Sequence, residues 1–105
     1  MEGIELISFE IISAVGTARS LYIEAIQLAK EGKFEEAEAM IQEGKDTFTK
    51  GHHAHATLIQ KEASGEKSEY SLLLMHAEDQ LMSAEGFGIL AEEFIDVYRK
   101  IIKID

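Results

Sequence analysis

The sequence predicts an all-α fold, an antiparallel three-helix bundle formed by a single domain over residues 1–105. Apolar residues recur at alternating spacings of three and four along almost the whole chain, which places them on one face of a helix. The chain contains no proline, the residue that breaks helix interiors. Two short polar segments with a glycine, at 30–33 and 64–68, separate the periodic stretches and are interpreted as the turns between three helices.

The first predicted helix occupies the N-terminal stretch up to Lys30, and Gly32 lies where a C-terminal cap is expected. Its main apolar stripe consists of Ile4, Ile7, Ile11, Ala14, Ala18, Leu21, Ala25 and Leu28. A second stripe consists of Phe9, Ile12, Gly16, Arg19, Ile23 and Ile26. The lone charge on that second stripe is Arg19. We expect a structural ion pair for this arginine, with Glu24, Glu62 or Asp79, and the alternative is that it neutralises a phosphoryl group.

The second predicted helix runs from about Phe34 to about Ala63. Its stripe consists of Phe34, Ala37, Ile41, Gly44, Phe48, Gly51, His55, Leu58 and Glu62. Two glycines on one stripe predict close helix approach or a local bend, because each costs a helix roughly 1 kcal/mol relative to alanine. His52 and His55 are one turn apart, as two metal ligands can be, but the chain has no cysteine and no second ligand pair to complete a zinc site. We interpret His55 as a packed histidine.

The third predicted helix spans residues 69–103, with Ser68 as its N-cap. One stripe consists of Leu74, Ala77, Leu81, Ala84, Gly88, Ala91, Ile95, Tyr98 and Ile102. The other consists of Leu72, Met75, Asp79, Met82, Gly86 and Ile89. Two apolar stripes imply burial on two sides, against the chain's own bundle and against something else. The sequence therefore predicts a bundle that oligomerises through its third helix.

The charge balance excludes several classes of partner. The net charge is −10, from 20 acidic and 10 basic residues, which argues against binding to nucleic acid or to an anionic membrane surface. A partner with a positive face would be attracted. We find no apolar run of the ~18 residues that a membrane span needs. The acidic N-terminal stretch is unlike a signal peptide, so a cytoplasmic location is expected.

His76 is the candidate for chemistry. Asp79 and Gln80 follow it at three and four residues, so both share its face of the helix. A neutral imidazole has a free nitrogen lone pair that can attack phosphorus, provided that the other nitrogen is held in one tautomer. The apolar neighbours Leu72, Leu73 and Met75 would limit access of water. The alternative is a structural histidine with a satisfied hydrogen bond, and spacing alone favours that alternative.

Asp79 is the more anomalous residue, because an unpaired carboxylate is costly on an apolar stripe. If the stripe lies on a symmetry axis, copies of Asp79 converge and repel one another. Protonation or a shared divalent cation must then offset the repulsion. A surface aspartate, or one paired with a lysine or arginine, is the alternative reading of the same spacing.

Several segments resemble one protein family along nearly the whole chain. LLMHAEDQLM at 73–82 is similar to the phosphorylation-site region of the lactose/cellobiose-type enzyme IIA of the bacterial sugar phosphotransferase system. LIQKEASG at 58–65 resembles the end of that family's second helix. GTARS at 16–20, with EA at 24–25, AKEG at 29–32 and FEEA at 34–37, resembles its first helix and turn. Jointly these segments are specific, although each alone is a weak signal.

The resemblance implies a homotrimer of three-helix bundles that acts as a phosphocarrier, a phosphotransferase component and not a stand-alone enzyme. His76 would accept a phosphoryl group from phospho-HPr, on its Nε2 atom, and donate it to the cognate enzyme IIB. Enzyme IIB would phosphorylate a lactose-, cellobiose- or chitobiose-type disaccharide arriving through IIC. The three copies of Asp79 would hold a divalent metal ion, Mg²⁺ being the expected one, at the trimer axis. Some members have a histidine where this chain has Gln80, so a supporting role for Gln80 would be that of a neutral amide.

Two rival functions fit the residues without the resemblance. The first is a non-catalytic helical module that uses the third helix for assembly. The second is a histidine phosphotransfer domain of two-component signalling. That class usually has a four-helix arrangement with a basic residue close to its histidine, whereas the nearest basic residues to His76 are Lys67 and Arg99.

Overall fold

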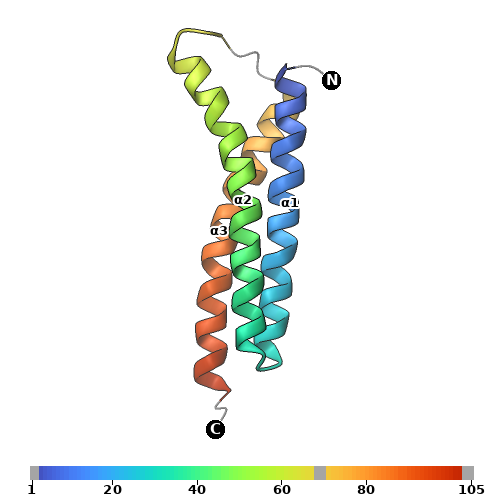
Figure 1. Cartoon of the computed structure of the whole chain (residues 1–105), viewed down its shortest axis with the longest axis vertical. Coiled ribbons are helices and arrows are strands. Elements are labelled where there is room, and N and C mark those ends of the chain that lie inside the picture. Colours follow the sequence, from blue (N-terminus) through green and yellow to red (C-terminus); the bar gives the residue numbers. More distant parts are fainter. Residues whose placement is uncertain (1–2, 68–70, 103–105) are drawn as a thin grey trace.

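The computed structural model describes residues 3–67 and 71–102, and these form three helices and no strand. They are α1 (Gly3–Lys30), α2 (Phe34–Ala63) and α3 (Leu72–Ile101). Helices that follow one another in the chain run antiparallel, so α1 and α3 are parallel (Figure 1). The bundle is elongated, with extents of 58 × 23 × 19 Å. The predicted all-α three-helix bundle is confirmed.

The turn between α1 and α2 depends on Gly32. Its φ of 78° is left-handed, a conformation that glycine adopts without the steric cost of a Cβ atom. The Gly32 N–H donates to the Ala29 carbonyl at 3.0 Å, and the Lys33 N–H donates to the Leu28 carbonyl at 3.0 Å. These bonds satisfy carbonyls that the helix end leaves free. The predicted cap at Gly32 is confirmed.

The start of α3 differs from the prediction. Ser68, the predicted N-cap, and Glu69 lie outside the described residues, as does the predicted end at Lys103. The described helix begins at Leu72 and is capped by Ser71, whose Oγ accepts a hydrogen bond from the Leu74 N–H at 3.1 Å. Both serines satisfy the sequence preference for an N-cap, and the pattern alone does not choose between them.

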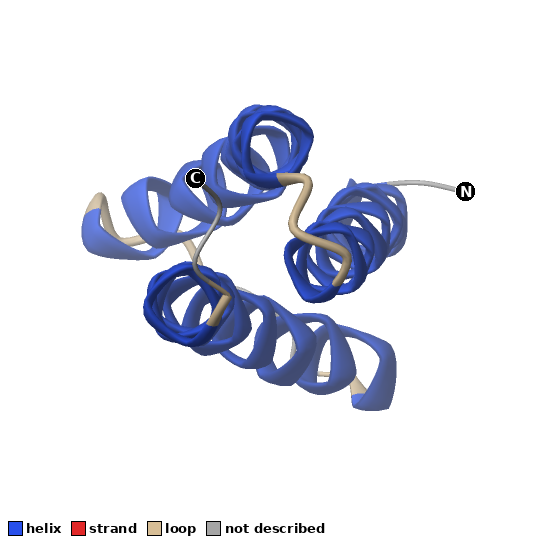
Figure 2. Ribbon diagram, turned by 90° about the horizontal axis from the view of Figure 1, so that it is seen from below, coloured by secondary structure: helices blue, strands red, loops and turns tan. Residues whose placement is uncertain are grey.

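The core is a set of stripes from all three helices. Figure 2 shows the helices seen from one end, packed around a common centre. The predicted α3 stripe is buried from Leu74 to Ile95. The predicted α1 stripe is only partly right: Ile11, Ala18 and Ala25 are buried, and its other members, Ile4, Ile7, Ala14, Leu21 and Leu28, are half-buried. The buried residues of α1 are Ser8, Ile11, Val15, Ala18, Tyr22, Ala25 and Ala29.

Glycines bring the helices close, as predicted. A Cβ atom built on Gly51 would lie 3.0 Å from Val15 Cγ1. Cβ atoms on Gly44 and Gly88 would lie 2.6 Å and 2.8 Å from the ring of Tyr22. The Tyr22 ring of α1 therefore fills the space that these two glycines leave on α2 and α3.

Two ion pairs and one hydrogen bond between a histidine and a carboxylate link α2 to α3 at three levels. Arg99 pairs with Glu38, Lys45 Nζ lies 2.6 Å from Glu92 Oε1, and His55 Nε2 lies 2.8 Å from Glu78 Oε2. From the start of α2 to its end, the α2 residues Glu38, Lys45 and His55 meet α3 residues progressively nearer the start of α3, as antiparallel packing requires. The first two pairs are about half exposed, and such surface pairs contribute roughly 0–1 kcal/mol.

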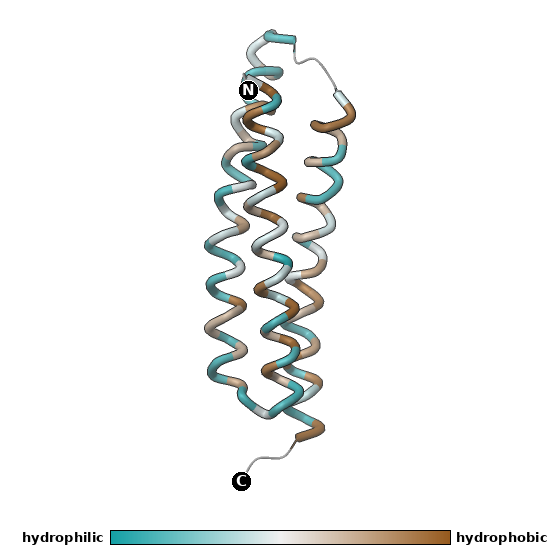
Figure 3. The backbone as a smooth tube through the Cα atoms, turned by 90° about the vertical axis from the view of Figure 1, so that its right-hand side faces the viewer, coloured by the Kyte–Doolittle hydropathy of each residue, from teal (hydrophilic) through white to brown (hydrophobic). Residues whose placement is uncertain are grey.

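Helix α1 has a composition that was not expected. By length and composition alone it is apolar enough to cross a membrane, with a window of mean hydropathy 1.3, so the expectation that no segment qualifies is wrong. Its apolar colouring is visible beside the more hydrophilic α2 in Figure 3. The core helix of a bundle passes the same test, and α1 supplies the buried stripe that packs against both other helices.

Candidate functional site

His76 lies in the second turn of α3, close to the capped end. The neighbouring buried side chains are those of Leu74, 2% exposed, and Ala77, fully buried. Ala77 belongs to the core cluster with Ile11 and Val15, which fixes this turn against α1. The His76 side chain is exposed. The fold thus presents an imidazole at the surface of a helix held firmly on its opposite face.

Asp79 and Gln80 share the face of His76, as their spacing predicts. Asp79 is exposed and Gln80 is half-buried. Among the described residues, no side-chain hydrogen bond joins any of the three to another. A hydrogen bond that fixes the tautomer of His76 must therefore come from a group other than Asp79 or Gln80.

An apolar stripe on α3 surrounds Asp79 and is not covered by any of the described residues 3–67 and 71–102. Leu72 is 84% exposed and Met82 is 67% exposed. The large exposed apolar residues of α3 are Leu72, Met75, Met82, Ile89, Leu90, Phe94, Val97 and Ile101. The predicted second stripe is thus present and uncovered. Leu72 and Met75 are exposed and Leu73 is half-buried, so in the described part of one chain the first two do not shield His76 from water.

The charge on α3 is one-sided. Between Leu72 and Tyr98 it has no basic residue, and its acidic residues are Glu78, Asp79, Glu85, Glu92, Glu93 and Asp96. Two of these carboxylates are paired across to α2, with His55 and Lys45. A positive charge that stabilises an anion on His76 must therefore come from another helix or another molecule.

The histidines of α2 do not converge on a metal site. His52 lies beside Phe48, with ring centroids 6.3 Å apart, and His53 is exposed. In the described part of one chain, no three histidine, aspartate or glutamate side chains are grouped to hold a metal ion. Asp79 by itself offers one carboxylate. A cation at Asp79 would need ligands from further copies of the chain.

The structure contains a hydrogen bond that the sequence does not predict. His55, expected to be packed in the core, is half-buried and bonds to Glu78 of α3. Glu78 was not singled out, because its position next to Ala77 resembles that of any polar residue at the edge of an apolar stripe. The antiparallel order of α2 and α3 could have brought the two residues to the same level, but only with the register known.

Arg19 does not form the ion pair that was expected. It is half-buried, and the ion pairs found between described residues do not include it with Glu24, Glu62 or Asp79. It remains on the same stripe of α1 as Phe9 and Ile23, which are both exposed.

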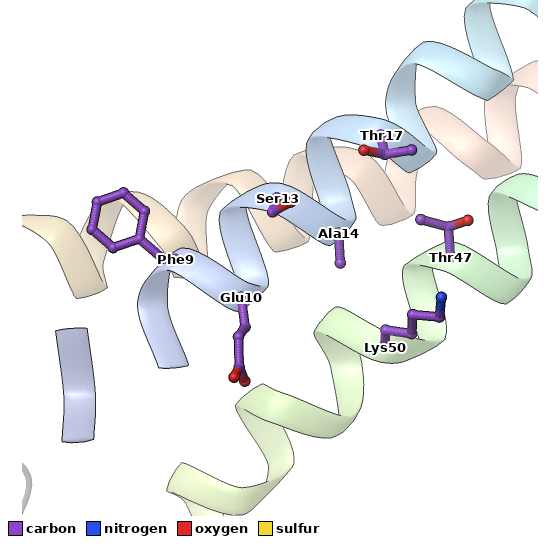
Figure 4. A pocket seen from close by; sticks show the side chains of 7 residues that line it. All are labelled: Phe9, Glu10, Ser13, Ala14, Thr17, Thr47 and Lys50. Carbon is purple, nitrogen blue, oxygen red and sulfur yellow. The ribbon is translucent and has the colours of Figure 1, made fainter. Parts of the chain in front are cut away.

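The groove between α1 and α2 lies apart from His76. It has a volume of about 620 Å³ and is lined by Phe9, Glu10, Ser13, Ala14, Thr17, Thr47 and Lys50. In Figure 4, Glu10 extends from α1 toward α2, and Lys50 reaches from α2 back toward α1. None of the residues that line this groove is a histidine. The imidazole that can accept a group is therefore on an exposed helix face, accessible to a protein partner.

Comparisons with known proteins agree along the length of the chain. The family described as "PTS system, Lactose/Cellobiose specific IIA subunit" matches residues 6–99. The lichenan-specific phosphotransferase enzyme IIA component of Bacillus subtilis is 45% identical, over 95% of this chain and 91% of its own. The lactose-specific EIIA component of Staphylococcus aureus is 35% identical, over 94% and 96%.

Solved structures agree with these sequences. The crystal structure of the cellobiose-specific enzyme IIA from Bacillus anthracis superimposes with a TM-score of 0.93 at 46% identity, covering 96% of this chain and 93% of that one. A chain of the IIA(chitobiose)–HPr complex from the Escherichia coli phosphotransferase system gives a TM-score of 0.75 at 30% identity, covering 96% and 98%.

Proposed function

The chain belongs to the lactose/cellobiose-specific IIA subunits of the sugar phosphotransferase system, and from this premise we infer that His76 carries the phosphoryl group. The protein is a phosphotransferase component that takes a phosphoryl group from HPr and passes it to an enzyme IIB. His76 is the exposed histidine within the segment that resembles the family's phosphorylation site. The proposal rests on the exposure of this side chain and on its place in that segment.

The proposed reaction consists of two in-line transfers. Nε2 of His76 attacks the phosphorus of phospho-HPr, so that a P–N bond forms as the bond to the donor breaks. The second transfer repeats this with the IIB nucleophile as attacking group and His76 as leaving group. Exposure of the imidazole supports both steps, because two different proteins must reach the same atom.

We assign Gln80 a supporting role. It lies four residues after His76 on the same face and is half-buried, which restricts its side chain. Its amide would donate a hydrogen bond to a phosphoryl oxygen. The acidic character of α3 makes such a neutral donor useful, since a carboxylate there would repel the phosphoryl group.

We propose that Asp79 marks the axis of a homotrimer and that its three copies hold a divalent metal ion, Mg²⁺ being the expected one. The uncovered apolar residues around Asp79 support an interface, because monomers rarely leave a long apolar stripe in solvent. Carboxylate oxygens are the ligands that hard divalent cations prefer. Bound there, the ion would offset the repulsion between the aspartates.

Labelling with phosphorylated HPr tests the role of His76. The wild-type chain should acquire one acid-labile phosphoryl group, and His76→Ala should acquire none. His53→Ala removes another exposed histidine and serves as the matched control. Label that survives His76→Ala would sink the assignment. No label on the wild type, in the presence of active phospho-HPr, would sink the phosphocarrier role of this chain.

Mass and metal content test the role of Asp79. The native protein should have the mass of three chains and contain one divalent ion per trimer. Asp79→Leu should stay trimeric, lose the ion and gain stability, since an apolar side chain replaces a costly carboxylate. A monomer at micromolar concentration contradicts the trimer, and a metal content unchanged by Asp79→Leu contradicts the site.

One rival function has an observation in its favour. The exposed stripe of α3 would also suit a module that assembles without catalysis. Such a module predicts oligomers and no phosphohistidine, so the labelling experiment decides between the two.

For the sugar we propose the class named above, a lactose-, cellobiose- or chitobiose-type disaccharide. Capture of the cognate IIB identifies the system. We place the protein in the cytoplasm, where the lack of cysteine fits a reducing compartment.

A further inference from the structure

One hydrogen bond crosses from α2 to α3 at the level of His76. His55 Nε2 lies 2.8 Å from Glu78 Oε2. The two side chains are 21% and 30% exposed, so this pair is better shielded from solvent than the other two pairs between these helices. Shielding makes a hydrogen bond to a carboxylate stronger and its geometry better defined.

Apolar packing between α2 and α3 is sparse in this half of the bundle. The core cluster beside His76 consists of Ile11, Val15, Ala77, Leu81 and Ala84, all from α1 and α3. From α2 it receives the half-buried Phe48 and Ala54. Of the three helix pairs, α2 and α3 pack least extensively, and Figure 1 shows the upper part of α2 leaning away from the other helices. The bond from His55 to Glu78 is therefore a specific link where packing supplies little.

The position of Glu78 relative to His76 means that the bond to His55 can restrict rotation of α3. Two residues apart on a helix point roughly 200° away from each other, so Glu78 and His76 lie on opposite sides of α3. The buried stripe between them, which includes Leu74, Ala77 and Leu81, holds α3 in the core along one side only, and rotation of the helix about its axis would move both flanking faces. A bond on the far side of α3 resists that rotation.

We propose that His55 and Glu78 are positioning residues for phosphoryl transfer. Their bond fixes the rotation of α3 and thereby the direction in which the His76 imidazole faces its protein partners. The inference rests on the proposed function of His76. Neither side chain touches the phosphoryl group, because both lie on the α2 side of α3. In-line transfer depends on alignment, so a small rotation lowers the rate without weakening the docking of HPr.

Steady-state transfer from phospho-HPr separates the two effects. His55→Ala should lower kcat about tenfold and change KM less than about twofold, because alignment is lost while the docking surface is kept. His53→Ala, an exposed histidine two residues away, is the matched control and should transfer at the wild-type rate. His55→Gln should recover most of the rate, since an amide still donates a hydrogen bond to Glu78.

Exchanging the histidine and the glutamate between positions 55 and 78 tests the bond itself, apart from the effect of each single substitution. His55→Glu places two carboxylates opposite each other, and Glu78→His places two imidazoles there, so each single variant should be slow. The double variant H55E/E78H rebuilds the bond in the reverse direction and should be faster than both. Circular dichroism and melting temperature confirm that all variants are folded.

Three results would count against the proposal. A wild-type kcat for His55→Ala, even with a lowered melting temperature, shows a structural bond without a positioning role. A raised KM at unchanged kcat shows a docking residue instead. A folded double variant as slow as its parents also overturns the proposal. Absence of label on wild-type His76 would overturn the function and the inference together, which distinguishes that failure from the other three.

Discussion

Tyr22 places a phenol in the centre of the bundle, where it is 3% exposed. Burial raises the pKa of this phenol above its usual value of 10.0, and the negative charge of Glu92 raises it further. The ring lies against the backbone positions of Gly44 and Gly88, where the folded chain surrounds it with apolar atoms. Ionisation of Tyr22 is therefore disfavoured in the folded state and unhindered in the unfolded state.

This shift predicts a loss of stability in alkali. Because the pKa of Tyr22 is higher in the folded chain, its contribution to the free energy of unfolding is fully present below about pH 10 and decreases as the pH rises through the folded value. Urea unfolding across this range should show the decrease. Tyr22→Phe keeps the ring and removes the proton, so its alkaline decrease should be smaller. Equal slopes for both proteins would contradict the account.

At the residue scale, spacing along the sequence predicts which residues share a helix face but not every contact between helices. His76, Asp79 and Gln80 follow from spacing and from a resemblance, and the structure brings them onto one face of α3 as predicted. The bond between His55 and Glu78 could not be predicted, because it depends on the register of two helices. A shift of one turn would separate these side chains without changing either helical pattern.

At the scale of the helices, the close approach of the Tyr22 ring to Gly44 and Gly88 predicts that one added methyl group lowers the stability of the bundle. Alanine at either position would put a Cβ atom within 2.8 Å of the Tyr22 ring. The ring cannot move away from one glycine without moving toward the other, so each substitution should cost about 1–3 kcal/mol of unfolding free energy.

Gly16→Ala is the control for this prediction, because a Cβ atom there meets nothing within 4 Å. Helix propensity alone should make that variant more stable by up to about 1 kcal/mol. Chemical denaturation of the three variants gives the comparison. If Gly44→Ala and Gly88→Ala are as stable as Gly16→Ala, the packing of Tyr22 described above is wrong.

Helix periodicity predicted the elements well and the buried face of α1 less well. The stripe expected on α1 included Ala14 and Leu21, whereas Val15 and Tyr22 are the buried residues. Apolar residues surround much of α1, so several stripes fit the pattern equally. The pattern of α3 gave two apolar stripes, and the one from Leu74 to Ile95 is the stripe that the bundle buries. The capping serine was missed because Ser68 and Ser71 both suit an N-cap.

At the scale of the whole molecule, charge dominates the encounter with partners. The chain has a net charge of −10, and α3 has no basic residue between Leu72 and Tyr98. A complementary positive surface on HPr would speed association and become less effective as salt screens it. We expect KM for phospho-HPr to rise with ionic strength while kcat changes little. Neutralising Glu85 or Glu93, both exposed, should reduce this salt dependence.

Uncharged osmolytes at matched concentration are the control for the salt experiment. A KM that is independent of salt would contradict electrostatic steering.

The expected trimer also belongs to the scale of the whole molecule. The sequence predicted assembly from the second stripe of α3, and the structure leaves that stripe uncovered within one chain. The number of copies stays a prediction, because an exposed stripe does not specify which symmetry covers it.

The unequal packing of the three helices has a consequence for the order in which the chain folds and opens. α1 and α2 are neighbours in sequence and pack most extensively, whereas α3 is held mainly through α1. Local contacts form at the lowest entropic cost, so the α1–α2 hairpin should fold first and α3 should dock last and open first. If α3 also forms the contact between subunits, dilution will release it before it disturbs the hairpin.

Native-state hydrogen exchange measures this directly. Amides of α3 should lose protection as the protein is diluted, whereas amides of the hairpin should exchange at rates independent of concentration. Concentration-independent protection of α3 would contradict the coupling. Under this coupling, the helix that bears the histidine becomes fully ordered only in the assembled protein, so assembly itself would decide when the chain is competent to carry a phosphoryl group.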